Sequence, residues 1–268
     1  MRRGGRMSTA TTREEQRRRF FEAKAQAWSN LDFEGAELPR LERLRARLGD
    51  LRGTRIYEPG CGCGRLLRRL VEWVGPQGRV VAVDSSPRMA EAAAAALAAT
   101  GAGCGEVHCA DFLSYMPSET ELDLVLFFCV LPHLEDPARA ISRGAALLRP
   151  GGRLVIYTPN AESLGHQWFG KDWRGLEPPR HPFVFSPQSL RAMLHASRLH
   201  SFRMTTRPTL AGGIYDDSVR IRRNGTTPVC HGRRERGRAF FMLMERLLCL
   251  AGRERGEEME GVVFRQHR

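Results

Sequence analysis

The sequence predicts an α/β fold built on an open, doubly wound parallel sheet. Two observations predict it: short apolar runs recur along the middle of the chain, and segments with helical spacing separate them. Apolar runs without alternation are typical of strands buried on both faces of a parallel sheet. The strands are expected at residues 54–58, 79–84, 106–110, 122–129 and 153–158. Such a sheet binds its ligands at the carboxyl ends of its strands.

The helices expected between these strands carry an apolar face or a clear start signal. In residues 65–74, five apolar side chains fall on one side of a helix, namely Leu66, Leu67, Leu70, Val71 and Val74. Three further helices begin with a capping side chain followed by proline, an order that suits the first turn of a helix. They are 87–99 after Ser86, 137–148 after Asp136 and 187–197 after Ser186.

The chain has 268 residues and a net charge of +12. This length suits one large domain. The excess charge is concentrated in residues 1–19 and 220–238. A basic segment can bind nucleic acid, bind an anionic membrane surface or simply be solvated. We expect residues 1–19 to form a disordered tail and residues 20–268 a single domain, with residues 20–50 as an amphipathic helical lid.

The second half of the chain continues this pattern less regularly. Residues 160–185 are rich in Trp, Pro and His and are expected to be irregular. Two further strands are expected at 200–207 and 258–265. Between them lies an insertion at about 208–256, which contains a helix candidate at 238–252.

Several features of the sequence are typical of a cytoplasmic protein. The longest apolar run, residues 124–131, is far shorter than the roughly 18 residues needed to cross a bilayer. The N-terminus is basic but lacks the apolar core of a secretory signal. The seven cysteines are dispersed without the spacing of a disulfide framework, which favours reduced thiols.

Residues 57–64, YEPGCGCG, place three glycines between a strand and a helix. This is the context of a nucleotide-binding loop, where glycine lets the backbone approach a ligand closely. Glu58 stands at the loop entrance, where a carboxylate repels a pyrophosphate but attracts a cationic amino group. Asp84 ends the next strand, where an acid can hold the two hydroxyls of a ribose. S-adenosylmethionine has a ribose and an amino group and carries no phosphate.

The two cysteines of the same loop have a simpler interpretation. Cys61 and Cys63 are two residues apart, a spacing poorly suited to an unstrained disulfide. A zinc site would need two more ligands at a suitable spacing, and none stands out. We therefore expect both to be small residues tolerated in a glycine loop, with a redox or arsenic-type thiol role as the alternative.

Taken together, these stretches resemble the class I S-adenosylmethionine-dependent methyltransferases over roughly residues 20–207. The matching stretches, in family order, are YEPGCGCG, VVAVDSSPRM, HCADF, LDLVLFFCVLPHLEDP and LLRPGGRLVIYTPN. The resemblance implies a Rossmann-like sheet of seven strands with helices on both faces. It implies an antiparallel last strand, which residues 258–265 would supply, and S-adenosylmethionine as the cofactor.

The resemblance also implies individual cofactor contacts. The methionine part of the cofactor is expected near Glu58, Gly60, Gly62 and Gly64. The ribose is expected on Asp84 and the adenine near Asp111 and Phe112. Ser85, Met89 and Cys129 belong to the matching stretches and are expected at the same site.

The stretch FGKDWRGLEPPRHPFVFSPQSL is similar to a branch of the family acting on cell-envelope sugars, lipids, quinones or secondary metabolites. Ubiquinone-pathway O-methyltransferases carry two carboxylates and a histidine after the fourth strand, associated with a divalent metal. Here Cys129 and Pro132 replace the carboxylates and only His133 remains, so we expect no metal. The Asn/Asp-Pro-Pro-aromatic motif of amino-group methyltransferases of DNA and some RNA is absent.

These comparisons favour a small-molecule or lipid-linked acceptor, methylated at oxygen, and make nucleic acid an unfavoured partner. A hydroxyl acceptor needs a base near neutral pH, for which histidine is suited. We hypothesise that His133, after the fourth strand, or His181, after the fifth, removes the proton. The alternatives are a structural or cofactor-wall role for His133 and a hydrogen-bonded loop anchor for His181. His166 is expected at the surface.

Four aromatic residues and one helix have two interpretations each. Trp28 either closes a lid over the cofactor or packs its helix on the sheet. Trp168, Phe169 and Trp173 either line an aromatic acceptor pocket or anchor a long loop. The helix at 238–252 either lies at a membrane interface, giving peripheral membrane contact, or packs on the sheet edge.

Two rival functions remain. The basic segments alone suggest an RNA or protein methyltransferase. A catalytically silent cofactor-binding subunit would also keep every cofactor motif. The sequence does not indicate the oligomeric state.

Overall fold

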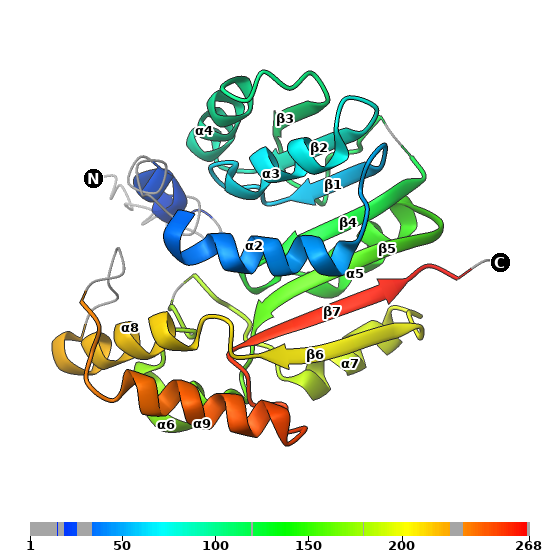
Figure 1. The fold of residues 1–268 in the computed structure, drawn as a ribbon. Coiled ribbons are helices and arrows are strands. Elements are labelled where there is room, and N and C mark those ends of the chain that lie inside the picture. The colour runs from blue at the N-terminus through cyan, green and yellow to red at the C-terminus, as the bar shows by residue number, and fades with distance from the viewer. Residues whose placement is uncertain are drawn as a thin grey trace, which may run out of the picture.

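The computed structural model describes Glu15 and residues 19–25, 34–118, 120–178, 180–225 and 233–266. Most of the expected tail, Trp28 and part of the second basic segment lie outside these residues. A seven-stranded sheet in the order β3-β2-β1-β4-β5-β7-β6 forms the centre of the molecule (Figure 1). The predicted doubly wound sheet with an antiparallel last strand is confirmed.

The strand order reverses between β1 and β4, so the glycine loop after β1 lies at the switch point of the sheet. The first five strands run parallel to one another, and β7 runs antiparallel to both of its neighbours, β5 and β6. The strands are β1 (Arg55–Pro59), β2 (Arg79–Asp84), β3 (Gly105–Cys109), β4 (Leu122–Phe128), β5 (Leu148–Pro159), β6 (Phe202–Arg207) and β7 (Glu258–Phe264).

Strand β5 is longer than the sequence predicted. It begins at Leu148, which pairs with Leu122 of β4, and the pairing register then shifts before Arg153 meets Leu124. The turn-forming residues between them are therefore held within the strand as an irregularity. Gly151 also donates its N–H to the carbonyl of Arg265, which ties this start of β5 to the end of β7.

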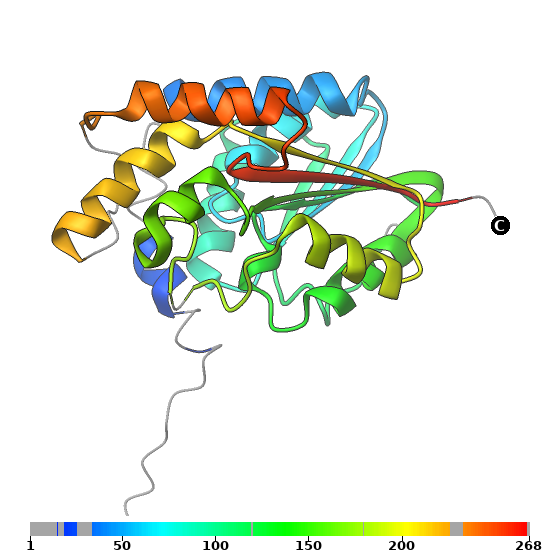
Figure 2. The same ribbon diagram turned by 90° about the horizontal axis from the view of Figure 1, so that it is seen from below.

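Helices cover both faces of the sheet (Figure 2). Helices α2 (Glu34–Leu48), α3 (Arg65–Val74) and α4 (Pro87–Ala98) share one buried cluster, and α5 (Pro137–Leu147) and α7 (Pro187–Ala196) share another. Ser86, Asp136 and Ser186 each accept a backbone N–H in the first turn of the helix they precede. The three predicted helix starts are therefore confirmed.

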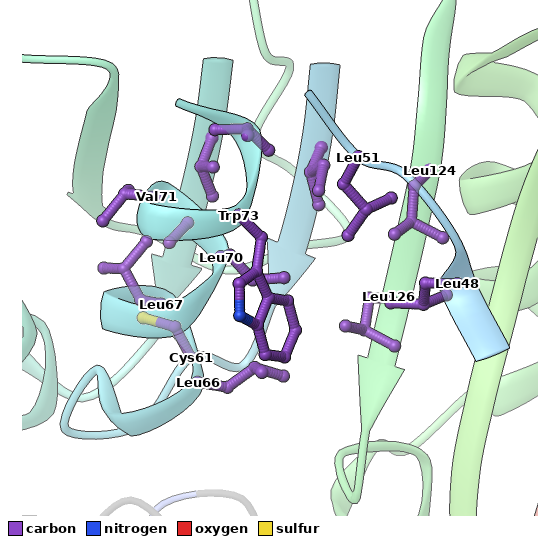
Figure 3. Close-up of a cluster of buried hydrophobic side chains, with 14 of the residues drawn as sticks. Leu48, Leu51, Cys61, Leu66, Leu67, Leu70, Val71, Trp73, Leu124 and Leu126 are labelled. Atoms are coloured by element: carbon purple, nitrogen blue, oxygen red, sulfur yellow. The ribbon is translucent and has the colours of Figure 1, made fainter. Parts of the chain in front are cut away.

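The α3 face shows how the apolar pattern becomes packing (Figure 3). Its leucines share one buried cluster with Leu124 and Leu126 of β4, and the Trp73 ring lies between the two groups in this view. Leu67 and Leu70 are fully buried. Burying a leucine side chain contributes roughly 1.5–3 kcal/mol, so this layer holds the glycine loop that leads into α3.

The insertion and the segment after β5 together form a third layer with its own small core. Helices α6 (Leu164–Phe169), α8 (Ala211–Asn224) and α9 (Arg238–Leu250) pack around the buried side chains of Phe169, Trp173, Ala211, Tyr215 and Phe241. Strand β6 is parallel to β5, since both pair antiparallel with β7. Both α6 and α8 therefore begin beyond the carboxyl edge of the sheet, and α9 returns the chain to β7 there.

Two segments differ from the sequence prediction. Residues 160–185 were expected to be irregular but contain α6 and the short 3-10 helix η2 (Gly170–Asp172). Helix α8 was not predicted, because its first turn holds the weak helix formers Gly212 and Gly213. Tertiary contacts stabilise it: Asp216 accepts the N–H of Glu235 and pairs with Arg238, both far along the chain.

None of the described helices is long and apolar enough to cross a membrane.

Candidate functional site

The glycine loop adopts a backbone that only glycine tolerates easily. Gly60, Gly62 and Gly64 have φ of 70°, 56° and 78°, a region costly for other residues. A Cβ on Gly60 would clash with Val130, and one on Gly64 would lie 2.9 Å from the Cα of Ala93. A Cβ on Gly62 would meet no other atom within 4 Å. The outer glycines thus serve close packing, and the middle one presents open backbone to a ligand.

Glu58 is a buried carboxylate with an unused oxygen. It lies on β1, is 2% exposed, and its Oε2 has no hydrogen-bond partner among the described residues. Burial, and secondarily the charge of Asp84, raises its pKa to about 8. A buried polar group without a partner is costly. A cationic ligand beside the loop would supply the missing partner and return the carboxyl to its ionised form.

Asp84 holds the loop and the start of α4 together. Its Oδ2 accepts the N–H of Gly62 and its Oδ1 that of Ser86, both at 2.9 Å. Burial raises its pKa, although the two backbone hydrogen bonds oppose the shift. Each carboxylate oxygen can accept a second bond, so the group can still receive two ribose hydroxyls. Ser85 is exposed beside it.

The loop after β3 supplies the expected adenine end. Asp111 is exposed, and its Oδ1 accepts the N–H of Leu113 at 3.0 Å. Phe112 is buried, with its ring edge-on to Phe127 at 5.4 Å and tilted 5.6 Å from Tyr57.

Tyr57 was missed by the sequence reasoning. It lies on β1 beside Glu58, is fully buried, and its hydroxyl has no partner among the described residues. Burial, with the nearby charges of Tyr115 and others, raises its pKa. The signal was a tyrosine at a central position of a short strand expected to be buried, where a hydroxyl needs a hydrogen-bond partner.

Met89 and Cys129 each belong to an apolar cluster that contains a cysteine of the loop. Met89 is 1% exposed and packs with Ala25 and Cys63. Cys129 ends β4 with φ 57°, a strained backbone for a residue other than glycine, and donates its N–H to the carbonyl of Tyr157. This sharp turn directs the chain into η1 (Leu131–His133).

Cys61 and Cys63 are both buried, each in a different apolar cluster. Cys61 lies beside the leucines of α3 in Figure 3. Burial raises the pKa of the Cys61 thiol well above its ordinary value, which disfavours the thiolate needed for redox or metal chemistry. Among the described residues, no group of His, Cys, Asp and Glu is arranged to hold a metal ion. Packing accounts for both cysteines.

The two candidate bases lie together. The ring centroids of His133 and His181 are 4.7 Å apart. The two residues come from different loops, and His133 also contacts the backbone of Arg180, 47 residues further along the chain. His133 Nδ1 lies 3.1 Å from the carbonyl oxygen of Arg180, and His181 Nδ1 lies 2.8 Å from that of Gly175. Each carbonyl can only accept, so both neutral rings carry their proton on Nδ1.

The two imidazoles differ in environment. His181 is buried, which lowers its pKa to about 4. Its Nε2 lies 3.5 Å from a carboxylate oxygen of Glu177, which itself pairs with Arg174 and Arg180. His133 is only half-buried and stands three residues after Val130, the side chain that packs on Gly60. His133 therefore follows closely on the segment that packs against the glycine loop.

A helical segment at residues 19–25 spans both parts of the site. Phe21 meets the His133 ring edge-on at 5.1 Å and also packs against the cluster of Ala25, Cys63 and Met89. The guanidinium of Arg180 lies 4.8 Å above the Phe20 ring. The segment thus contacts both the cluster beside the glycine loop and the histidine pair.

The aromatic residues after β5 divide into two groups. Trp173 is 1% exposed, donates its Nε1–H to Glu257 at 2.8 Å and stacks on His166. It anchors the loop, as Phe169 does in the same cluster. His166 is half-buried, with its ring stacked on Trp173. Trp168 is 46% exposed and faces α9.

A family model described as a methyltransferase domain matches residues 33–199. The chain belongs to this family. The match runs from α2 to α7 and includes the glycine loop, Asp84, Asp111 and both histidines. The fold and family identify a class I S-adenosylmethionine-dependent methyltransferase of Rossmann-like architecture.

Curated relatives match about half of this chain. The ubiquinone biosynthesis O-methyltransferase of Xanthomonas euvesicatoria is 32% identical over 149 residues, which are 52% of this chain and 59% of that protein. The protein-L-isoaspartate O-methyltransferase 2 of Archaeoglobus fulgidus is 31% identical over 131 residues, 48% of this chain and 55% of that protein. The chain spans less than two thirds of the length of each.

Among solved structures, the phosphoethanolamine N-methyltransferase 2 of Haemonchus contortus, in complex with S-adenosyl-L-methionine, has a TM-score of 0.66 at 13% identity. The alignment covers 97% of this chain and 61% of that one. A putative sarcosine dimethylglycine methyltransferase of Galdieria sulphuraria has a TM-score of 0.63 at 17% identity, covering 94% and 98%. Both likenesses show the fold.

S-adenosylmethionine is the cofactor, and the residues present fit it. The unused oxygen of Glu58 suits the cofactor's ammonium group, and the remaining acceptor capacity of Asp84 suits the ribose. The open backbone at Gly62 leaves room between them. When bound, the cofactor supplies an activated methyl group on a sulfonium.

Proposed function

We propose that this methyltransferase acts on a hydroxyl oxygen of a small-molecule or lipid-linked acceptor, with His133 as the base. The observation that carries the proposal is the position of His133, next to the residues that pack on the glycine loop and under Phe21 of the lid segment. Relatives named as O-methyltransferases of ubiquinone, nocamycin and malonyl-acyl carrier protein support oxygen as the methylated atom.

The chemistry asks little of the protein beyond placement and a proton acceptor. Methyl transfer from a sulfonium is an in-line displacement, so the enzyme must hold the acceptor in line with the methyl group and exclude water. The Nδ1–H of His133 is directed to the Arg180 carbonyl, which leaves the basic lone pair on Nε2. That nitrogen takes the hydroxyl proton as the new carbon–oxygen bond forms.

We assign His181 a positioning role. Its low pKa keeps it neutral near physiological pH, and its ring packs against His133. Its Nδ1 hydrogen bond to Gly175 fixes the loop whose Arg180 carbonyl orients His133. No step requires a metal, because Cys129 and Pro132 stand where related enzymes have carboxylates.

The first experiment identifies the acceptor class. The purified protein is incubated with methyl-labelled S-adenosylmethionine and a lysate from its source, and the products are partitioned into organic, aqueous small-molecule and macromolecular fractions. Label in the organic or aqueous small-molecule fraction supports the proposal. Label on macromolecules would contradict it and favour an RNA or protein methyltransferase instead.

The second experiment assigns the base. With the labelled product as the assay, His133→Gln is expected to lower kcat at saturating cofactor by at least about 100-fold, with little change in cofactor affinity. His181→Gln should lower kcat less and preserve the shape of the pH profile, since it acts through His133. Unchanged kcat in His133→Gln would remove it as the base.

A further inference from the structure

An apolar stripe lies on the outer face of α9. Phe240, Leu243, Leu247 and Leu250 are 57%, 54%, 50% and 85% exposed. Their spacing of three, four and three residues places them along one side of a helix. Trp168 of α6 extends the stripe, since its ring centroid lies 6.5 Å from that of Phe240. Five of the seven exposed large hydrophobic side chains in the described part belong to this surface.

The buried face of α9 fixes this orientation. Phe241 and Glu245 are fully buried, and Phe241 packs with Phe169 and Tyr215. The helix is therefore already docked on the protein through its other side, and rotation cannot hide the stripe. The sequence alone left open whether α9 packs on the protein or lies at a membrane. The structure shows packing on one face and an uncovered apolar face opposite.

Arginines surround the stripe without acidic partners. Arg246 is exposed at its edge, at a helical position next to the leucines. Four more exposed arginines flank the two ends of α9, namely Arg233, Arg234 and Arg236 before it and Arg253 after it. None of these five side chains forms an ion pair with a described acidic residue, whereas Arg238 at the helix start pairs with Asp216.

The arginines around the stripe indicate what binds to it. A second copy of the chain would bring these arginines against the same arginines, at a cost in like-charge repulsion. Helix α9 runs along the outer edge of the molecule (Figure 2). Leucine and aromatic side chains on a helix edged by arginine are the pattern of a helix lying in the interface of an anionic bilayer.

We infer that the apolar stripe of α9, with Trp168, docks the enzyme on anionic lipid surfaces. The leucines enter the acyl boundary, and Trp168 sits at the level of the headgroups. The arginines bind lipid phosphates while their stems lie along the apolar face. This inference concerns where the enzyme sits and holds whichever molecule accepts the methyl group.

Co-sedimentation with vesicles tests it. The full chain is mixed with vesicles of phosphatidylcholine alone or with phosphatidylglycerol added. Binding is expected only to the anionic vesicles and should weaken as salt rises. Leu243→Ser/Leu247→Ser should lower the partition coefficient at least about tenfold. Arg246→Gln/Arg253→Gln should lower it by about fivefold for each charge removed.

Matched variants separate docking from folding. Leu243→Met/Leu247→Met keeps the apolar area and should bind as the parent does. Arg139→Gln removes an exposed arginine from α5, on the other face of the sheet, and should also bind normally. Cofactor binding measured by calorimetry should be unchanged in all variants. This readout does not depend on acceptor turnover, so failure here is distinct from failure of the proposed function.

Two outcomes would overturn the inference. One is a parent protein that remains in the supernatant with anionic vesicles, or a serine variant that sediments as well as the parent. The other is a dimer in light scattering that the serine variant converts to a monomer, which would assign the stripe to a second copy.

Discussion

Two buried carboxyls in this molecule each have an oxygen without a partner and a raised pKa, but their surroundings differ. Glu58 at the glycine loop and Glu245 beneath α9 each have an oxygen without a partner among the described residues. Burial raises both pKa values, to about 8 for Glu58 and about 9 for Glu245. Glu58, however, stands beside the open backbone of Gly62. Glu245 lies on the buried face of α9, against the backbone of Glu257.

The comparison shows that an unused buried oxygen does not by itself identify a ligand site. Glu245 Oε1 accepts the N–H of Glu257, and neighbouring Glu257 accepts the N–H groups of Trp173 and Gly165. In these buried surroundings the protonated form of Glu245 is more stable than the ionised form. A cationic ligand would provide the missing partner of Glu58. Ligand binding should therefore change the ionisation of Glu58 and leave the ionisation of Glu245 unchanged.

The largest effect is expected from Glu58→Gln, which keeps the size of the side chain and removes its charge. A hydrogen bond to a charged group contributes about 1.5–3 kcal/mol, so affinity for S-adenosylmethionine should fall about 10- to 100-fold. Calorimetry measures this directly. Equal affinity in the variant would show that the cofactor's ammonium group does not use this carboxylate.

The pH dependence of cofactor binding should follow the same residue. Glu58 in the free protein is largely protonated below its pKa of about 8, and the ammonium favours its ionised form. Binding should therefore release a proton, and affinity should rise with pH up to about 8. Calorimetry in buffers of different ionisation enthalpy counts the protons. Glu58→Gln should lose most of the release, and a variant that kept it would locate the proton elsewhere.

Glu245→Gln is expected to change stability instead of cofactor affinity. The folded-state pKa of Glu245 is raised above its unfolded value of 4.5, so the folded state binds the proton more tightly. Its ionisation therefore costs stability as pH rises from about 4.5 toward 9. The free energy of unfolding of the variant should exceed that of the parent by about 1–3 kcal/mol at pH 8. The two values should be equal at pH 4.

Urea unfolding at the two pH values measures this. Some pH dependence should persist in the variant, because Glu257 has a pKa raised to about 7 and acts with the same sign. A variant destabilised at pH 8 would mean that the ionised Glu245 has a partner, and the contrast with Glu58 would fail.

Tyr57→Phe gives the smallest effect and sharpens the comparison. If the Tyr57 hydroxyl completes its hydrogen bonding on the cofactor, its removal should weaken binding about fivefold, as for one neutral hydrogen bond. The protein without cofactor should become slightly more stable, since a buried unsatisfied hydroxyl is removed. Unchanged affinity with raised stability would place Tyr57 with Glu245, as a group buried without a ligand.

The sequence predicted what local pattern encodes. Apolar runs located the strands, Ser-Pro and Asp-Pro pairs located three helix starts, and the glycine loop with Glu58 and Asp84 indicated the cofactor. It did not predict α8, because Gly212 and Gly213 oppose a helix that tertiary ion pairs then stabilise. Nor did it show that His133 and His181 lie in contact, since that depends on how the loop after β5 folds back.

The interior of the third layer, which residues 160–185 and the insertion build together, was also beyond sequence reasoning. Trp173 was equally suited to a pocket or an anchor until its Nε1–H was found on Glu257. Glu245 interrupts an apolar helix and would ordinarily be assigned to the solvent side. In the structure it points inward and the leucines point outward, an inversion that only the packing of α9 reveals.

The segment between α9 and β7 has a mechanical consequence. Asn160, at the end of β5, donates its side-chain amide to the carbonyls of Glu254 and Gly256, and its backbone N–H to that of Glu257. Leu164 donates to Arg255 in the same seam. The connector that leaves α9 is thus hydrogen-bonded to the start of the loop that carries His181. A force that displaces α9 would therefore act through these hydrogen bonds on the first residues of that loop.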